Sequence, residues 1–159
     1  MDERELKVVI RHAFTIKRLK TKGYQNYVFS RIAHLMQYHP VQLYRDVALV
    51  RSRETDVVEL RQAMCHIIMT LFDFSLRDTA ILCGLREDHS TVKYHMRKHY
   101  DRYGRNGYET YTEAYDRFLE FISYHWDTIT AVPGELEPLL FTPSKLLKLY
   151  EHHNKLVSI

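Results

Sequence analysis

The chain has 159 residues, of which 45% are apolar and 27% charged, so it is long enough for one compact domain or slightly more. Aromatic residues make up 13% of it, which argues against intrinsic disorder. No uncharged apolar run approaches the roughly 18 residues of a membrane-spanning helix, and the N-terminus lacks the apolar core of a signal peptide. Cys65 and Cys83 form no metal-binding or disulfide motif. We therefore expect a soluble cytoplasmic protein.

The net charge of +3 hides four blocks of alternating sign. Residues 1–53 carry 11 basic and 4 acidic side chains, and residues 54–88 carry 3 and 7. Residues 89–107 carry 5 basic and 1 acidic side chains, and residues 108–159 carry 4 basic and 8 acidic side chains. A small total charge can therefore coexist with a strongly basic face.

The spacing of apolar residues predicts an all-α protein, because the strict alternation typical of strands is scarce. A first helical stripe runs from Leu6 to Ile16 and stops near residues 22–23. A second stripe runs from Val28 to Met36 and ends before Pro40. Because proline is favoured in the first turn of a helix, Pro40 predicts a short third helix.

The longest apolar helix is expected to begin at Asp56, after a basic link over residues 51–53. Glu59 follows three residues later, as in a capping box. The apolar stripe of this helix consists of Val57, Leu60, Met64, Ile67, Ile68 and Leu71.

The next stretch predicts two further helices separated by a tight turn. Ser75, with Asp78 three residues later, is typical of a helix N-terminus. This helix lasts only about two turns, because Cys83-Gly84 is a C-terminal stop signal. Asp88 then caps a longer helix that runs to residues 103–104. A short helix, a tight turn and a longer helix form the outline of a helix-turn-helix.

The second of these helices has two chemically different faces. Its core side consists of Val92, Met96, His99 and Tyr103. Its outer side carries Ser90, Lys93, Tyr94 and Arg97. A DNA recognition helix needs this combination, with apolar groups that fix the helix and polar or basic groups that reach base edges and phosphates. A solvated surface face would show the same pattern.

Two motifs at matching positions favour the recognition-helix interpretation. An Arg-Gln pair stands at residues 61–62 in the long helix, and the run Asp-His-Ser-Thr-Val opens the second helix at residues 88–92. Together they resemble the C-terminal DNA-binding domain of the bacterial replication initiator DnaA. The resemblance covers roughly Tyr27 to Tyr103. It implies a DnaA/Trp-repressor-like helix-turn-helix domain over residues 27–104, flanked by an N-terminal helix (1–26) and a C-terminal helical extension (105–159).

The resemblance also implies a set of DNA contacts. Base contacts would come from Asp88, His89, Ser90 and Thr91 in the major groove and from Arg61 in the minor groove of A·T-rich DNA. Phosphate contacts would come from Arg51, Arg53, Lys93 and Arg97. Asp88 could instead serve purely as a helix cap, and Arg61 as a phosphate clamp or surface ion pair.

Three departures from the family pattern bear on function. The turn over residues 84–88 is one residue longer than the commonest family spacing. Glu87 stands beside the expected DNA surface, where its charge repels phosphate. No GxxxxGK[ST] loop occurs, so neither nucleotide binding nor ATPase activity is expected.

Catalysis has little support in the sequence. His95 and His99 share a helical face, but no HExxH motif or flanking carboxylate completes a metal site. His99 also lies on the core side, where a satisfied core histidine is the simpler interpretation. We therefore expect no enzymatic activity, no metal and no cofactor.

The C-terminal region predicts two further amphipathic elements. An aromatic stripe consists of Tyr111, Tyr115, Phe118, Ile122, Trp126 and Ile129. Thr142-Pro143 then begins a last helix, whose stripe consists of Leu146, Leu149, Tyr150 and Leu156. We expect these elements to pack on the DNA-binding unit. They could alternatively dock a replication protein or a second copy of the chain.

The sequence as a whole predicts a nucleoid-associated protein that binds double-stranded DNA sequence-specifically. Its role would be that of an accessory or regulator of replication at a replication origin, without contact to membranes. Two alternatives remain: a transcription regulator with the same fold, and a protein-interaction module that has lost DNA binding.

Overall fold

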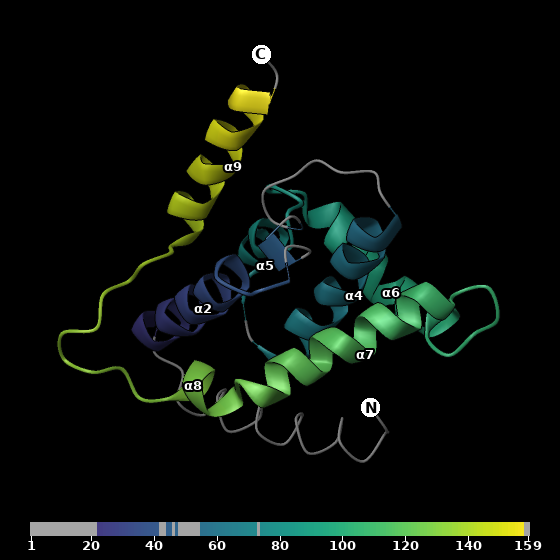
Figure 1. Cartoon of the computed structure of the whole chain (residues 1–159), viewed down its shortest axis with the longest axis horizontal. Coiled ribbons are helices and arrows are strands. Elements are labelled where there is room, and N and C mark those ends of the chain that lie inside the picture. The colour runs from purple at the N-terminus through teal and green to yellow at the C-terminus, as the bar shows by residue number, and fades with distance from the viewer. Residues whose placement is uncertain (1–21, 42–43, 46, 48–54, 73, 158–159) are drawn as a thin grey trace.

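The computed structural model of the chain describes residues 22–41, 44–45, 47, 55–72 and 74–157. These residues form helices and no strand, which confirms the predicted all-α fold. The helices are α2 (Lys22–Gln37), α4 (Thr55–Leu71), α5 (Leu76–Leu82), α6 (His89–Arg102), α7 (Glu109–Tyr124), α8 (Trp126–Thr130) and α9 (Pro143–Val157) (Figure 1). No helix of this described part is long and apolar enough to cross a membrane.

Two expected elements lie wholly or partly outside the described residues. The N-terminal stripe from Leu6 to Ile16 is the first. The short helix after Pro40 is the second, although Tyr44, Arg45 and Val47 are helical, as that prediction requires.

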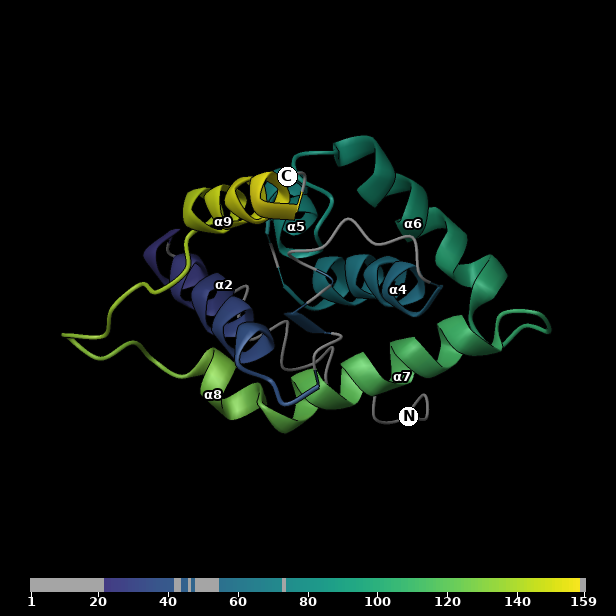
Figure 2. The same cartoon turned by 45° about the horizontal axis from the view of Figure 1, so that its top comes forward.

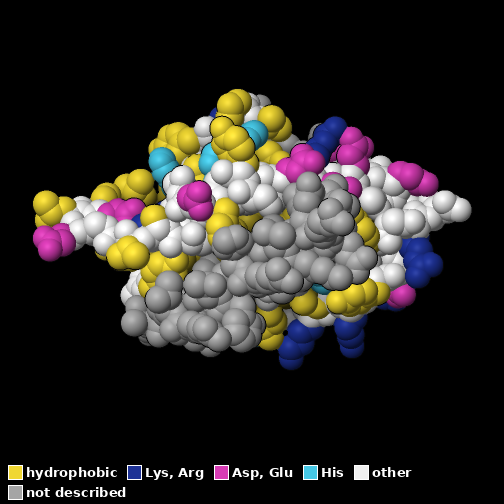
Figure 3. All heavy atoms as spheres, turned by 90° about the horizontal axis from the view of Figure 1, so that it is seen from below, with side chains coloured by type: hydrophobic (Ala, Val, Ile, Leu, Met, Phe, Trp, Pro, Cys, Tyr) yellow, Lys and Arg dark blue, Asp and Glu magenta, His cyan; other side chains and the backbone are white. Residues whose placement is uncertain are grey.

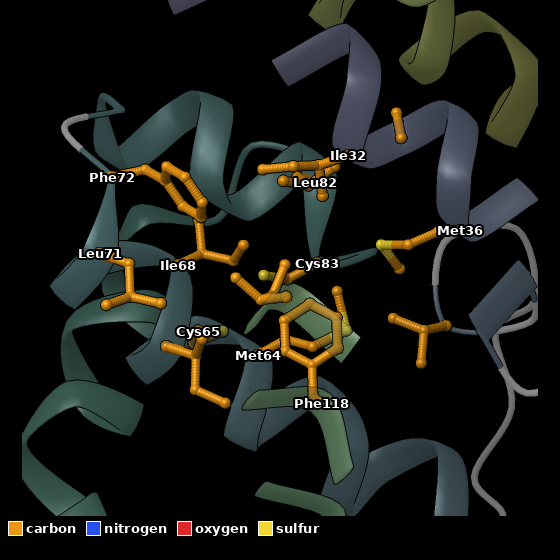
Figure 4. Packing of buried hydrophobic residues seen from close by; sticks show 14 of the residues in the cluster. Ile32, Met36, Met64, Cys65, Ile68, Leu71, Phe72, Leu82, Cys83 and Phe118 are labelled. Carbon is orange, nitrogen blue, oxygen red and sulfur yellow. The ribbon is translucent and has the colours of Figure 1, made fainter. Parts of the chain in front are cut away.

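Helix α4 forms the centre of the molecule (Figure 2). It packs against α5, α6 and α7, and every residue of its predicted apolar stripe is buried. Figure 4 shows Phe118 of α7 close to Met64 of α4, with Cys83 nearby at the end of α5. The buried core extends from Tyr24 in α2 to Tyr150 in α9, so all the described helices contribute to one core.

The helices of the predicted helix-turn-helix begin and end where the local signals indicate. The Ser75 hydroxyl accepts a hydrogen bond from the backbone N–H of Asp78 at 3.0 Å and so caps α5. Helix α5 ends at Leu82 with Cys83 as its C-cap, and Gly84 turns the chain with a φ of 77°. Only glycine adopts this left-handed conformation without strain. Helices α5 and α6 then pack against each other.

The C-terminal region packs on this unit mainly as predicted. The aromatic stripe is buried, but it lies on two helices, since α7 and α8 are separated at His125. Helix α9 packs on α5, and the Tyr150 hydroxyl donates a hydrogen bond to the Ile81 carbonyl oxygen. Leu149 was expected in the buried stripe and is 41% exposed, so that detail of the prediction is wrong.

Two glycines with positive φ allow a matched test of the turn. A Cβ atom at Gly84 would lie 1.9 Å from the Val47 carbonyl oxygen, whereas one at Gly107 (φ 88°) would meet no atom within 4 Å. Gly107→Ala should cost only the left-handed strain, about 1–2 kcal/mol. Gly84→Ala should cost about 2–5 kcal/mol, because overpacking adds about 1–3 kcal/mol to the same strain. Urea denaturation measures both, and equal effects would contradict the close approach at Gly84.

Candidate nucleic-acid interface

The first turn of α6 is held by two hydrogen bonds that Thr91 donates to Asp88. One Asp88 carboxylate oxygen accepts the Thr91 backbone N–H at 3.0 Å, and the other accepts the Thr91 hydroxyl at 2.5 Å. These hydrogen bonds to Thr91 stabilise the carboxylate and lower the pKa of Asp88. Asp88 therefore acts as the N-cap of α6, and His89 and Ser90 are left exposed on the same turn.

The outer face of α6 is polar and basic, as the sequence predicts. Lys93, Tyr94 and Arg97 are exposed, whereas Val92 and His99 are buried. Two cations lie near the Tyr94 ring, since the Lys98 ammonium and the Arg102 guanidinium are each 5.7 Å from its centroid. Contacts of this kind between a cation and an aromatic face are attractive. The helix thus presents a row of cations with an aromatic ring among them.

The turn before α6 adds a cation that sequence reasoning missed. Arg86 is exposed and has a φ of 56°, a left-handed conformation that is unusual for a residue with a side chain. No local sequence signal marks an arginine for this conformation. Beside it, Glu87 forms an ion pair with Arg77 at 2.9 Å. The guanidinium of Arg77 therefore partly offsets the negative charge of Glu87, which disfavours contact with phosphate.

Arg61 lies beneath the turn rather than on the face formed by α6. Its guanidinium donates a hydrogen bond to the Val47 carbonyl oxygen at 3.1 Å, and its Nε would be 3.3 Å from a Cβ atom at Gly84. Burial lowers the pKa of Arg61. In this conformation Arg61 supports the turn from inside, and its contact with a minor groove stays a prediction. Arg51 and Arg53 lie outside the described residues.

A buried cluster of histidines and tyrosines holds α6 in place. The rings of His66 in α4 and His99 in α6 are stacked with centroids 3.7 Å apart. His66 Nδ1 is within hydrogen-bond distance of the Tyr115 hydroxyl (3.0 Å), and His99 Nδ1 of the Tyr111 hydroxyl (2.8 Å). Both tyrosines belong to α7, so this cluster, here called the His66–His99 stack, joins α4, α6 and α7.

The histidines of this region are held in the neutral form. Burial lowers the pKa of His66 to about 3, with a further contribution from the neighbouring His99, and lowers the pKa of His99 to about 4. Burial and then the charge of Arg102 lower the pKa of His95 to about 4. His99 is 6% exposed, which confirms its predicted place in the core. Within the described part of the chain, no group of three His, Cys, Asp or Glu residues could hold a metal ion.

Basic side chains project from one edge of the molecular surface. Figure 3 shows Lys or Arg side chains along the lower edge of one face, whereas acidic side chains lie at its left end and, beside a basic one, at its upper right. Residues 76–102, which span α5 and α6, carry six basic and four acidic side chains.

A scan against protein-family models and searches of curated proteins and solved structures returned no match. The resemblance to the DnaA domain therefore stays a prediction that rests on short motifs.

The neutral histidines predict a loss of stability in acid. The folded pKa values of about 3 to 4 lie below the unfolded value of 6.5, so the unfolded chain binds protons first as the pH falls. The free energy of unfolding should be highest above pH 6.5 and decrease below it. Each of the three histidines contributes up to about 1.4 kcal/mol per pH unit. Urea midpoints measured between pH 4 and pH 8 would show this slope.

A matched pair of variants assigns the slope to the buried rings. His99→Phe combined with Tyr111→Phe removes a titrating group together with its hydrogen-bond partner, so the slope should become shallower. His89→Gln changes an exposed histidine and should leave the slope unchanged. An unchanged slope in the double variant would contradict the assignment.

Proposed function

We propose that the chain binds double-stranded DNA sequence-specifically, with α5 and α6 as a helix-turn-helix. The observation that carries this proposal is the first turn of α6, which is capped, exposed and preceded by a short helix and a tight turn. His89 and Ser90 offer ring nitrogens and a hydroxyl, groups that form hydrogen bonds with base edges in a major groove. The Thr91 methyl group can contact a thymine methyl, while Asp88 mainly holds the turn and retains lone pairs that can accept from cytosine.

The exposed cations around this turn are suited to phosphate contacts. Lys93 and Arg97 lie on the outer face of α6, and Arg86 stands on the turn. Phosphate contacts orient a protein on the duplex and supply most of the salt-dependent affinity. The strain at Arg86 supports a role for it, because strained residues tend to persist where function requires them. Arg51, Arg53 and Arg61 complete the proposed set by resemblance.

The DnaA-like motifs favour a role in replication initiation, as an accessory or regulator that occupies initiator-like, A·T-rich sites. Selection of bound duplexes from a random pool tests this role directly. Enrichment of short asymmetric A·T-rich boxes supports it. Enrichment of an unrelated sequence would support a transcription regulator instead, and the absence of any bound duplex would remove the DNA-binding proposal.

The phosphate contacts predict the salt dependence of binding. With about five phosphates neutralised, log affinity should fall against log salt with a slope of roughly −4 to −5. Lys93→Gln with Arg97→Gln should weaken binding to all duplexes and reduce the slope by about 2. Lys145→Gln with Lys148→Gln is the matched control, because it removes two charges from the exposed side of α9. Equal effects of the two double variants would contradict a phosphate-binding face on α6.

The base contacts predict a separate effect on specificity. His89→Ala should relax the preference at one base position by about 1–3 kcal/mol and leave the salt slope unchanged. Binding to single-position variants of the selected duplex measures this preference. If His89→Ala weakens binding to every variant duplex equally, His89 does not read a base.

A further inference from the structure

The segment between α8 and α9, residues 131–142, is fastened to α2 by one arginine. The Arg31 guanidinium donates hydrogen bonds to the Ile129 and Ala131 carbonyl oxygens at 3.0 and 2.5 Å. It also donates to both carboxylate oxygens of Glu137, at 3.1 and 2.7 Å. A bidentate pair of this kind fixes geometry as well as neutralising charge. The segment, here called the α8–α9 loop, therefore has a fixed position although it extends from the body as an open arc (Figures 1 and 2).

This anchored loop exposes apolar residues instead of burying them. The Glu137 backbone N–H donates a hydrogen bond to the Gly134 carbonyl oxygen at 3.2 Å, which closes a turn, and Leu136 on this turn is 96% exposed. Apolar and acidic side chains accordingly project at the left end of Figure 3, where the loop lies. Ordering a loop costs conformational entropy, yet Leu136 buries almost no apolar surface within the chain. Residues 134–137, here called the tip, are therefore suited to contact with a partner.

A pocket with a basic rim lies beside the loop at the start of α9. It has a volume of about 440 Å³ and is lined by Leu140, Phe141, Lys145, Lys148, Leu149 and His152. Its apolar lining is accessible, because Leu140 is 51% and Leu149 41% exposed. The Lys145 ammonium donates a hydrogen bond to the Leu139 carbonyl oxygen at 3.2 Å. Lys148 is exposed and pairs with no described residue, so its charge faces solvent at this site, which we call the α9 pocket.

The tip and the α9 pocket are complementary in chemistry. The tip carries Leu136 next to the exposed carboxylate of Glu135, and the pocket carries an apolar lining next to an ammonium group. The tip does not fill the pocket of its own chain, because Leu136 is almost fully exposed. Leu136 and Leu140 are only four residues apart, so the tip and the pocket share one edge of the molecule. Two complementary patches on one edge can be exchanged between two copies about a two-fold axis.

We propose that two copies of the chain associate by placing the tip of each copy in the α9 pocket of the other. Leu136 of one copy then packs against Leu140 and Leu149 of the second copy, and Glu135 comes beside its Lys148. The anchoring by Arg31 favours this contact, because a loop that is already ordered loses less conformational entropy on binding.

The contact is small, so the association should be weak, with a dissociation constant in about the micromolar range. At the roughly nanomolar concentrations at which specific DNA complexes form, the chain is then a monomer. The inference is independent of DNA binding, because none of the proposed DNA contacts lies in the α8–α9 loop or in α9.

Sedimentation of the full-length chain tests the proposal. The wild-type chain should change from monomer to dimer as its concentration increases through the micromolar range. Leu136→Asp should raise the dissociation constant about tenfold or more, because the burial of a leucine is lost at both contacts. Tyr124→Asp is the matched control, since it replaces another exposed apolar residue (85% exposed), and it should leave the constant unchanged. A monomer at every concentration, a dimer that Leu136→Asp leaves intact, or equal effects of the two variants would overturn the proposal.

Disulfide cross-linking tests which residues meet in the dimer. When Leu136→Cys chains are mixed with Leu149→Cys chains under mild oxidation, a mixed disulfide should form, because the tip of one copy lies in the α9 pocket of the other. Leu136→Cys with Tyr100→Cys is the control, since Tyr100 is 72% exposed but lies on α6, and it should react more slowly. The native cysteines are buried in every chain. Equal rates for the two mixtures would overturn the pairing of tip and pocket.

Discussion

The position of α6 depends on the stacking of two neutral imidazoles. His66 and His99 are stacked with centroids 3.7 Å apart in a buried site, where a charge on either ring would be both desolvated and repelled by the other. Each ring has a tyrosine hydroxyl of α7 at its Nδ1 atom, so both Nδ1 atoms have a hydrogen-bond partner inside the core. The same contacts that neutralise the stack therefore fix the rotation of α6 about its axis.

That rotation determines what α6 presents to solvent. With His99 and Val92 turned inward, Lys93 and Arg97 point outward, since they lie roughly 100–160° away from those two residues around the helix. The acidic groups nearby are engaged differently: Asp88 caps α6, and Glu87 pairs with Arg77. The near-neutral net charge of the chain therefore conceals a group of exposed cations on α6 and a group of exposed carboxylates along α7.

The sequence predicts the elements of this structure better than the contacts between them. Ser75 and Asp88 could be identified as caps because capping depends on backbone groups only three residues away. The inward position of Arg61 could not be predicted, because its partner is the Val47 carbonyl oxygen, which reaches it only through the tertiary fold. The left-handed Arg86 was missed for a similar reason: its conformation follows from joining two packed helices, and its own residue type disfavours it.

Helix α7 links the C-terminal region to the helix-turn-helix, and its buried and exposed sides have different roles. Its buried side supplies Tyr111 and Tyr115 to the His66–His99 stack, so the helix-turn-helix obtains its internal hydrogen-bond partners from beyond residue 104. A boundary placed at residue 104 by motif resemblance therefore divides one core. Its outer side carries the exposed carboxylates Glu109, Glu113 and Glu120. Helix α7 therefore stabilises the position of α6 from the core side without contributing to the face that α6 exposes.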